Sequence, residues 1–150
     1  NELYTISLAR RHLMDRRLLG IVAALITAGA IFTLTWMLAT IFPFAPPYNI
    51  EYWLQSERES YFASMPTAAY VTTLIGFLIG STAAGWMATK VSQVRGNPSM
   101  SIVVAIILVL FGAAYFFALL PGQPFWFVGL SLVFFVVFSL FGYTVARLRS

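Results

Sequence analysis

The sequence predicts an all-α fold: an integral membrane four-helix bundle with both termini on the cytoplasmic side, an N-terminal amphipathic segment and an aromatic outer loop. Three observations predict it. The 150 residues are 60% hydrophobic and only 9% charged, whereas a soluble domain carries about 25% charged residues. The apolar residues gather in four long stretches. The Lys and Arg residues lie almost entirely on one side of these stretches, as the positive-inside rule describes.

The first element is a cytoplasmic interfacial segment at residues 1–17, which precedes a transmembrane domain at residues 18–150. Residues 2–17 place apolar side chains and arginines on the same side of a helical wheel. This mixture is typical of a helix that lies on a membrane surface while its arginines reach lipid phosphates. The arginines expected to contact inner-leaflet phosphate are Arg10, Arg11, Arg16 and Arg17.

Four spans are expected at about 18–42, 67–89, 101–120 and 125–145. As helices they each extend about 30 Å or more, which is the thickness of the hydrocarbon core. Backbone groups without hydrogen bonds are costly in lipid, so helices are required. The first span is too long for a signal peptide, whose apolar region has about 7 to 15 residues.

Local signals mark the ends of these spans. Ser64 and Asn97, each followed closely by a proline, predict the starts of the second and third spans. The connection at 121–124 contains two prolines and a glycine and is so short that the last two spans must be antiparallel neighbours.

The orientation follows from the distribution of cations. One side carries eight of the nine: Arg10, Arg11, Arg16, Arg17, Lys90, Arg95, Arg147 and Arg149. The opposite side carries only Arg58. We therefore expect a multi-pass protein of the bacterial inner (cytoplasmic) membrane with both termini in the cytoplasm.

The outer loop at 43–65 is rich in aromatic residues, and Ile50, Trp53 and Leu54 recur at helical spacing. This pattern predicts a short interfacial helix, because aromatic rings favour the membrane–water boundary.

Small residues recur at helical spacing along the second span. The expected packing residues are Gly76, Gly80, Ala84, Gly85 and Ala88. Such a stripe allows two helix backbones to approach closely in lipid. It predicts packing within the bundle, with an oligomer or partner interface as the alternative.

Several kinds of chemistry are excluded or disfavoured. The chain has no Cys and one His, and no ionisable side chain lies at membrane depth, which argues against a proton pump, an ion-coupled transporter or a membrane-held haem. The hydroxyl groups in the spans predict helix packing, with a polar permeation path as the alternative. No metal and no cofactor are predicted, although lipid, carotenoid or quinone held by contact alone stays open. The positive-inside rule already explains why the Lys and Arg residues gather on the cytoplasmic side, so no nucleic-acid partner is expected.

Aromatic side chains on the last span and the outer loop are candidates for contact with a partner or with lipid. The residues selected are Trp53, Trp126, Phe134 and Phe138. Aromatic rings fill irregular gaps at low entropic cost, which suits contact with a neighbouring helix or a flat hydrophobic molecule.

The layout resembles small uncharacterised bacterial four-helix inner-membrane proteins. The resemblance is carried by the Gly-rich second span at 76–90, the Pro-containing outer loop and the closing segment at 142–148. It implies the same four-helix fold and no site residues. We expect a non-enzymatic structural or accessory subunit that contacts other integral membrane subunits and phospholipid. The alternative is a small oligomeric channel, carrier or lipid-handling protein.

Overall fold

The computed structural model describes residues 2–41, 54–92, 97–119 and 121–148, with side chains from residue 14 to 39 in the first of these ranges. All elements within these ranges are helical. In chain order they are α1 (Glu2–Ile41), α2 (Gln55–Ser64), α3 (Thr67–Ser92), α4 (Ser99–Ala114), the π-helix η1 (Tyr115–Leu119) and α5 (Phe125–Leu148).

Four of these helical segments are long and apolar enough to cross a membrane: Met14–Ala39, Thr67–Ser92, Ser99–Leu119 and Phe125–Leu148. The predicted all-helical fold, with four helices able to span a membrane, is therefore confirmed. The identity of the membrane and the orientation within it stay predictions.

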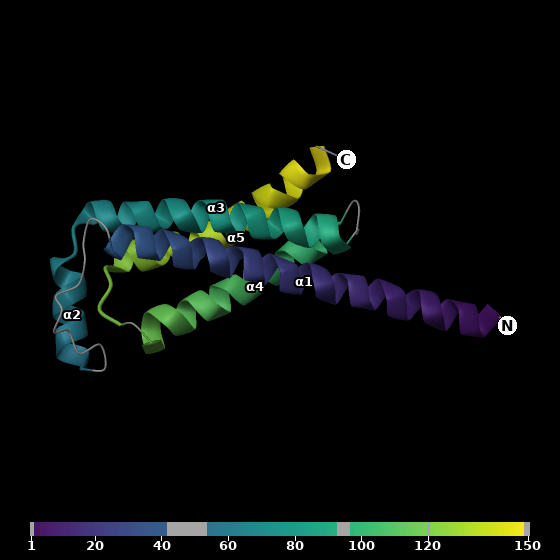
Figure 1. The fold of residues 1–150 in the computed structure, drawn as a ribbon, viewed down its shortest axis with the longest axis horizontal. Coiled ribbons are helices and arrows are strands. Elements are labelled where there is room, and N and C mark those ends of the chain that lie inside the picture. The colour runs from purple at the N-terminus through teal and green to yellow at the C-terminus, as the bar shows by residue number, and fades with distance from the viewer. Residues whose placement is uncertain (1, 42–53, 93–96, 120, 149–150) are drawn as a thin grey trace.

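α1 is one continuous helix through the boundary expected at residue 17. Its 40 residues correspond to about 60 Å, roughly twice the thickness of the hydrocarbon core. Figure 1 shows its N-terminal part projecting well beyond the other helices. A surface position for residues 2–17 would require a bend that α1 does not have, so inner-leaflet contact by this segment stays a prediction.

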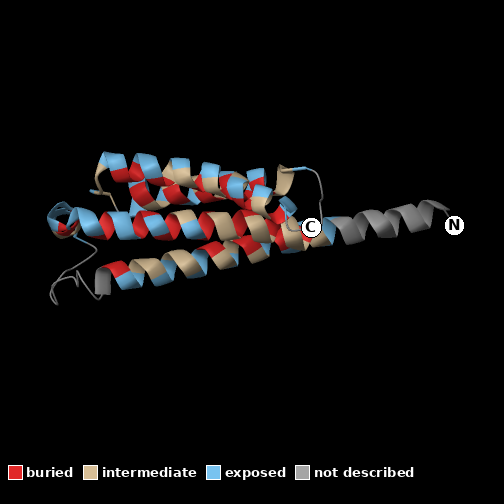
Figure 2. Ribbon diagram, turned by 90° about the horizontal axis from the view of Figure 1, so that it is seen from above, coloured by how far each residue is buried: buried red, intermediate tan, exposed pale blue. Residues whose placement is uncertain are grey.

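α3 occupies the centre of the bundle and packs against α1, α4 and α5. In its most apolar window 50% of the residues are buried, compared with 17% in α1. Figure 2 shows buried residues recurring along the inward sides of the long helices, while exposed residues cover the outside. The exposed side chains in the spans are mostly large and apolar, as expected for contact with lipid.

Both ends of the chain lie at the same end of the bundle (Figure 1). Arg16 and Arg17 on α1, Lys90 near the end of α3 and Arg147 near the end of α5 are all on this side. Arg58 lies at the opposite end on α2. The charge asymmetry noted in the sequence thus corresponds to the two ends of the folded bundle.

α2 runs across the other end of the bundle (Figure 1). It begins at Gln55, later than the Ile50 to Leu54 pattern predicts, and residues 42–53, which include Trp53, lie outside the described residues. The Tyr70 hydroxyl donates a 2.7 Å hydrogen bond to the Phe62 carbonyl, which joins α2 to α3. Ser64 does not cap α3 as predicted, because its hydroxyl donates to the Tyr61 carbonyl in its own helix at 2.8 Å.

The third span begins one residue later than predicted, with Pro98 rather than Asn97 as the N-cap of α4, and it ends differently. The Asn97 side-chain oxygen accepts a 2.9 Å hydrogen bond from the Ser99 backbone N–H at the start of α4. At the other end, α4 passes into η1 instead of continuing as α-helix to residue 120. Pro121 follows within two residues of η1, and a proline cannot donate to the helical ladder.

Candidate functional site

The small residues of α3 face two different helices. A Cβ atom built on Gly76 would overlap the Thr35 side chain of α1, and one on Gly80 would overlap Phe32 of α1. A Cβ on Gly85 would overlap the Ser139 carbonyl of α5 instead. Ala84 and Ala88 are fully buried and belong to the core. The stripe thus lies inside the bundle and is used for packing within this chain.

The closest crossing joins α3 to α5 through backbone atoms. A Cβ on Gly142 would overlap the Thr82 carbonyl and would lie 2.8 Å from the Trp86 backbone nitrogen. The Ser139 hydroxyl donates to the Ser81 carbonyl at 3.4 Å across this crossing. Side chains larger than hydrogen cannot be accommodated here unless the helices separate.

The other predicted contact residues are dispersed. Arg16 is partly buried and Arg17 is exposed at the end of the bundle that holds both termini, whereas the side chains of Arg10 and Arg11 lie outside the described residues. Trp126 is exposed and packs edge-on against Tyr70, with ring centroids 5.9 Å apart.

The aromatic run of α5 divides between the core and the outside. Phe127 and Phe135 are buried, whereas Phe125 is 87% exposed. Phe134 and Phe138 are half-buried and pack edge to face, with centroids 5.0 Å apart. The structure therefore does not bring the predicted contact residues of α5 together into one exposed surface.

A cavity that the sequence did not predict lies between α1 and the α4–η1 segment. Its volume is about 660 Å³, within the range of about 300 to 1,000 Å³ typical of sites for small ligands. We call it the α1–α4 groove. Its lining residues are Leu25, Gly29, Phe32, Thr33, Trp36, Thr73, Phe77, Leu108, Phe111, Gly112, Ala114, Tyr115, Phe116, Leu119, Gln123, Phe127 and Phe135.

The groove has a buried floor and an exposed rim. Its floor includes the buried rings of Phe77, Phe127 and Phe135, which pack against one another. Gly29 and Phe111 lie on opposite sides of the rim, on α1 and α4, and both are exposed. Because this rim lies within membrane-spanning segments, the groove opens toward the surrounding lipid.

The groove forms because α1 packs chiefly against α3 and only slightly against α4. α1 and α4 diverge toward the end of the bundle that carries α2 (Figure 1). The wider turn of η1 brings the neighbouring residues Tyr115 and Phe116 both to the groove. Isolated π-helical turns of this kind are often found at functional sites.

The groove reaches about half way through the bundle. It extends on α1 from Leu25, near the middle of that span, to Trp36, eleven positions further on, and on α4–η1 from Leu108 to Leu119, again eleven positions. At the helical rise this is about 16 Å, close to half of the roughly 30 Å hydrocarbon core.

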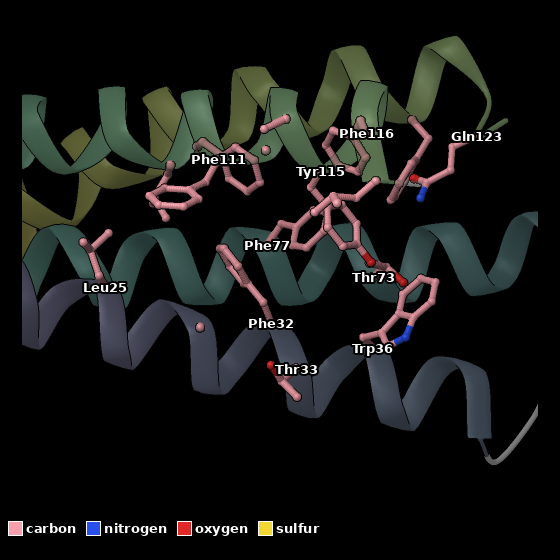
Figure 3. Close-up of a pocket in the computed structure, with 17 residues that line it drawn as sticks. Leu25, Phe32, Thr33, Trp36, Thr73, Phe77, Phe111, Tyr115, Phe116 and Gln123 are labelled. Atoms are coloured by element: carbon pink, nitrogen blue, oxygen red, sulfur yellow. The ribbon is translucent and has the colours of Figure 1, made fainter. Parts of the chain in front are cut away.

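Polar atoms gather at one end of the groove. Figure 3 shows Thr73, Trp36 and Gln123 near this end, Tyr115 and Thr33 nearer the middle, and Leu25 and Phe111 near the other end. The Gln123 side-chain oxygen is buried and accepts no hydrogen bond from the described residues. Gln123 is placed by the turn at Gly122, which has a φ of 104° and packs against Glu59 of α2. Such a φ favours glycine, because other residues are strained there.

None of the described residues that line the groove is charged. No group of three or more His, Cys, Asp or Glu residues suited to a metal occurs within the part of the chain that the structure describes. The groove therefore offers apolar contact and a few neutral hydrogen-bonding groups, and such a lining is suited to binding a hydrophobic molecule.

The hydroxyl groups of the spans mostly bond within their own helices. Threonine hydroxyls donate to carbonyls four residues earlier, at 2.8 or 2.9 Å, at Thr27, Thr35, Thr72, Thr73, Thr82 and Thr89. Ser101 of α4 instead reaches across to the Gly85 carbonyl of α3 at 3.1 Å. These bonds use the hydroxyls for helix structure and packing rather than for a polar path through the bundle.

The groove residues were missed by the sequence reasoning because no single segment contains them. Phe32, Phe77, Phe111 and Tyr115 come from three separate helices. A local signal was the run of three adjacent aromatics before Pro121, Tyr115, Phe116 and Phe117, and it does not predict a π-helix. Comparison with protein-family models, with curated proteins and with solved structures found no match to this chain.

Proposed function

We propose that this chain is a non-catalytic membrane subunit that acts by association, and that the α1–α4 groove is its contact surface for a hydrophobic partner molecule. The observation that supports this proposal best is the groove itself, with its buried aromatic floor and lipid-facing rim. Catalysis would require an acid, base, thiol or metal ligand at the site, and the described lining of the groove has no charged side chain and no Cys or His.

The groove also favours this function over a channel. A polar pore would need unsatisfied polar groups along a continuous path, whereas most of the span hydroxyls named above bond to their own helix. The groove ends near the middle of the bundle and opens sideways, so it offers a place to hold a molecule rather than a route across the membrane.

Photocrosslinking in native membranes tests the proposal. A photoreactive amino acid is placed at Phe111, which is 70% exposed on the groove rim, and in a control variant at Val133, which is exposed on α5 outside the groove. We expect position 111 to crosslink a defined hydrophobic molecule or a defined foreign membrane chain, and position 133 to crosslink bulk phospholipid.

Two results would contradict the proposal. Identical phospholipid adducts at both positions, together with purification as a lone monomer without bound molecules, would remove the groove as a contact surface. Crosslinks from position 111 to a second copy of this chain would favour the oligomeric alternative.

A further inference from the structure

We propose that the α1–α4 groove binds one chain of an uncharged, hydroxyl-headed lipid from a single leaflet, with the head group beside Gln123. This inference rests on the proposed function in one respect, that the groove is the contact surface, and it names the class of molecule held there.

The length of the groove selects a lipid chain over a partner helix. A transmembrane helix must cross both leaflets and needs about 30 Å of contact, whereas the groove covers about 16 Å from the middle of α1 to Trp36. A chain that enters from one leaflet needs only the depth of that leaflet. The groove ends near Leu25 and Leu108, where such a chain would end.

The lining of the groove fits the two parts of such a lipid. Leu25, Leu108 and Phe111 surround the deep end, where only apolar contact is available. Thr73 and Gln123 lie toward the opposite end, with Tyr115 between the two ends (Figure 3). This is the end nearest α2, because Gly122, next to Gln123, packs against Glu59 of α2. The arrangement matches a molecule whose tail points to the bilayer centre and whose polar head stays near the surface.

The charges at this end disfavour a phosphate-bearing head, because no cation lies in the described lining of the groove. Among the described residues, the charged groups at this end are Glu57, Arg58 and Glu59 of α2, which sum to one negative charge, and none of them lines the groove. The cationic residues Arg16, Arg17 and Lys90 lie toward the opposite end. A buried anion without a cation partner is strongly disfavoured.

The hydrogen-bonding groups specify a donor on the ligand. The Gln123 side-chain oxygen is buried without a described donor, and an unsatisfied buried acceptor costs about 1 to 3 kcal/mol. The Gln123 amide and the Tyr115 hydroxyl line the groove, and a ligand hydroxyl can both donate to and accept from such groups. Choline and ester groups provide no such donor.

The test uses the fluorescence of Trp36, which lines the groove. A variant that keeps Trp36 as its sole tryptophan (Trp53→Phe, Trp86→Phe, Trp126→Phe) is reconstituted in phosphatidylcholine vesicles. Dioleoylglycerol brominated on its chains is added as a quenching probe, and brominated phosphatidylcholine and phosphatidylglycerol are the comparison probes. We expect saturable quenching by the glycerol lipid at a low mole fraction, reversed by unlabelled dioleoylglycerol, and only linear quenching by the two phospholipids.

Matched variants assign the binding to the groove. Gly29→Phe places a ring in the groove, and Gly129→Phe places one on the outside of α5; neither glycine has a neighbouring atom within 4 Å of a built Cβ. Gly29→Phe should abolish saturable quenching, and Gly129→Phe should preserve it. Gln123→Leu removes the acceptor and should weaken the apparent affinity about fivefold. If Gly29→Phe does not fold, Thr33→Phe on the same exposed rim serves instead.

The outcomes separate this inference from the proposed function. Equal quenching by all three lipids, or saturable quenching that survives both groove variants, would overturn the inference. If Gly29→Phe releases a co-purifying membrane chain without changing lipid quenching, the groove binds protein, and only the proposed function survives. If lipid binding depends on the groove but crosslinking finds a lone monomer with lipid alone, the inference holds without a subunit role.

Discussion

The crossing of α3 and α5 allows a sharp prediction from two glycines of the same helix. Gly142 faces α3 so closely that a Cβ would overlap the Thr82 carbonyl and lie 2.8 Å from the Trp86 backbone nitrogen. Gly129 on α5 has no atom within 4 Å of a built Cβ. We predict that Gly142→Ala is destabilising and that Gly129→Ala is not.

The magnitude follows from the contacts. The atoms that a Cβ at Gly142 would meet belong to the α3 backbone, which cannot rotate away, so the helices must separate by about 1 Å to restore ordinary carbon contacts of about 3.5 Å or more. Separation weakens van der Waals contact along the crossing and lengthens the 3.4 Å hydrogen bond from Ser139 to Ser81. Overpacking of this kind costs about 1 to 3 kcal/mol, offset in part by up to about 1 kcal/mol of helix propensity.

Reversible unfolding in mixed micelles, with increasing mole fraction of sodium dodecyl sulfate, measures the free energy of unfolding. We expect Gly142→Ala to lose up to about 2 kcal/mol after the propensity gain is subtracted, and Gly129→Ala to match the parent or to gain up to about 1 kcal/mol, so that the two variants differ by about 1 to 3 kcal/mol. Equal free energies of unfolding for the two variants would refute the close crossing of α3 and α5.

Three further predictions concern orientation and packing. Single cysteines at Ser56 and Leu148, both exposed at opposite ends of the bundle, should be labelled in intact cells by an impermeant thiol reagent at 56 and not at 148; the reverse pattern would invert the topology. Phe127→Ala should cost about 3 to 5 kcal/mol because its ring is 1% exposed, whereas Phe125→Ala, at 87% exposed, should cost little; similar losses measured in the same micelle assay would contradict the core assignment. Ser101→Ala removes a hydrogen bond to a carbonyl of α3 and should cost about 0.6 kcal/mol; a loss above about 2 kcal/mol would show that more than this bond depends on the hydroxyl.

The spans could be predicted because each depends on its own residues. Hydropathy and length are local properties, and they located four helices within a few residues of those in the structure. The sequence changes from charged to apolar residues near residue 17. This change predicts that the environment of the chain changes from water to lipid, but it does not say whether the backbone hydrogen bonds of the helix continue, so the continuous α1 could not be predicted. The π-helix of η1 was missed for a related reason: the sequence around Tyr115 suits an α-helix equally well.

The candidate site depends on residues that are distant in sequence. The small residues of α3 predict close approach, but they do not say which helix approaches: Gly80 meets α1 and Gly85 meets α5. The groove arises from the angle between α1 and α4, which is set by how each packs on α3 and α5. No single segment of the sequence predicts that angle. In the sequence, Phe32 and Phe111 therefore look like ordinary apolar residues of two separate spans.

The central claim is that this chain works by holding a hydrophobic molecule in the α1–α4 groove. Native mass spectrometry of protein released from mild detergent tests it most directly, by comparing the parent chain with Gly29→Phe and Gly129→Phe. If the groove holds the lipid, one neutral lipid should be bound per chain in the parent and in Gly129→Phe, and none in Gly29→Phe. Identical bound species in all three proteins, or none in any of them, would contradict it.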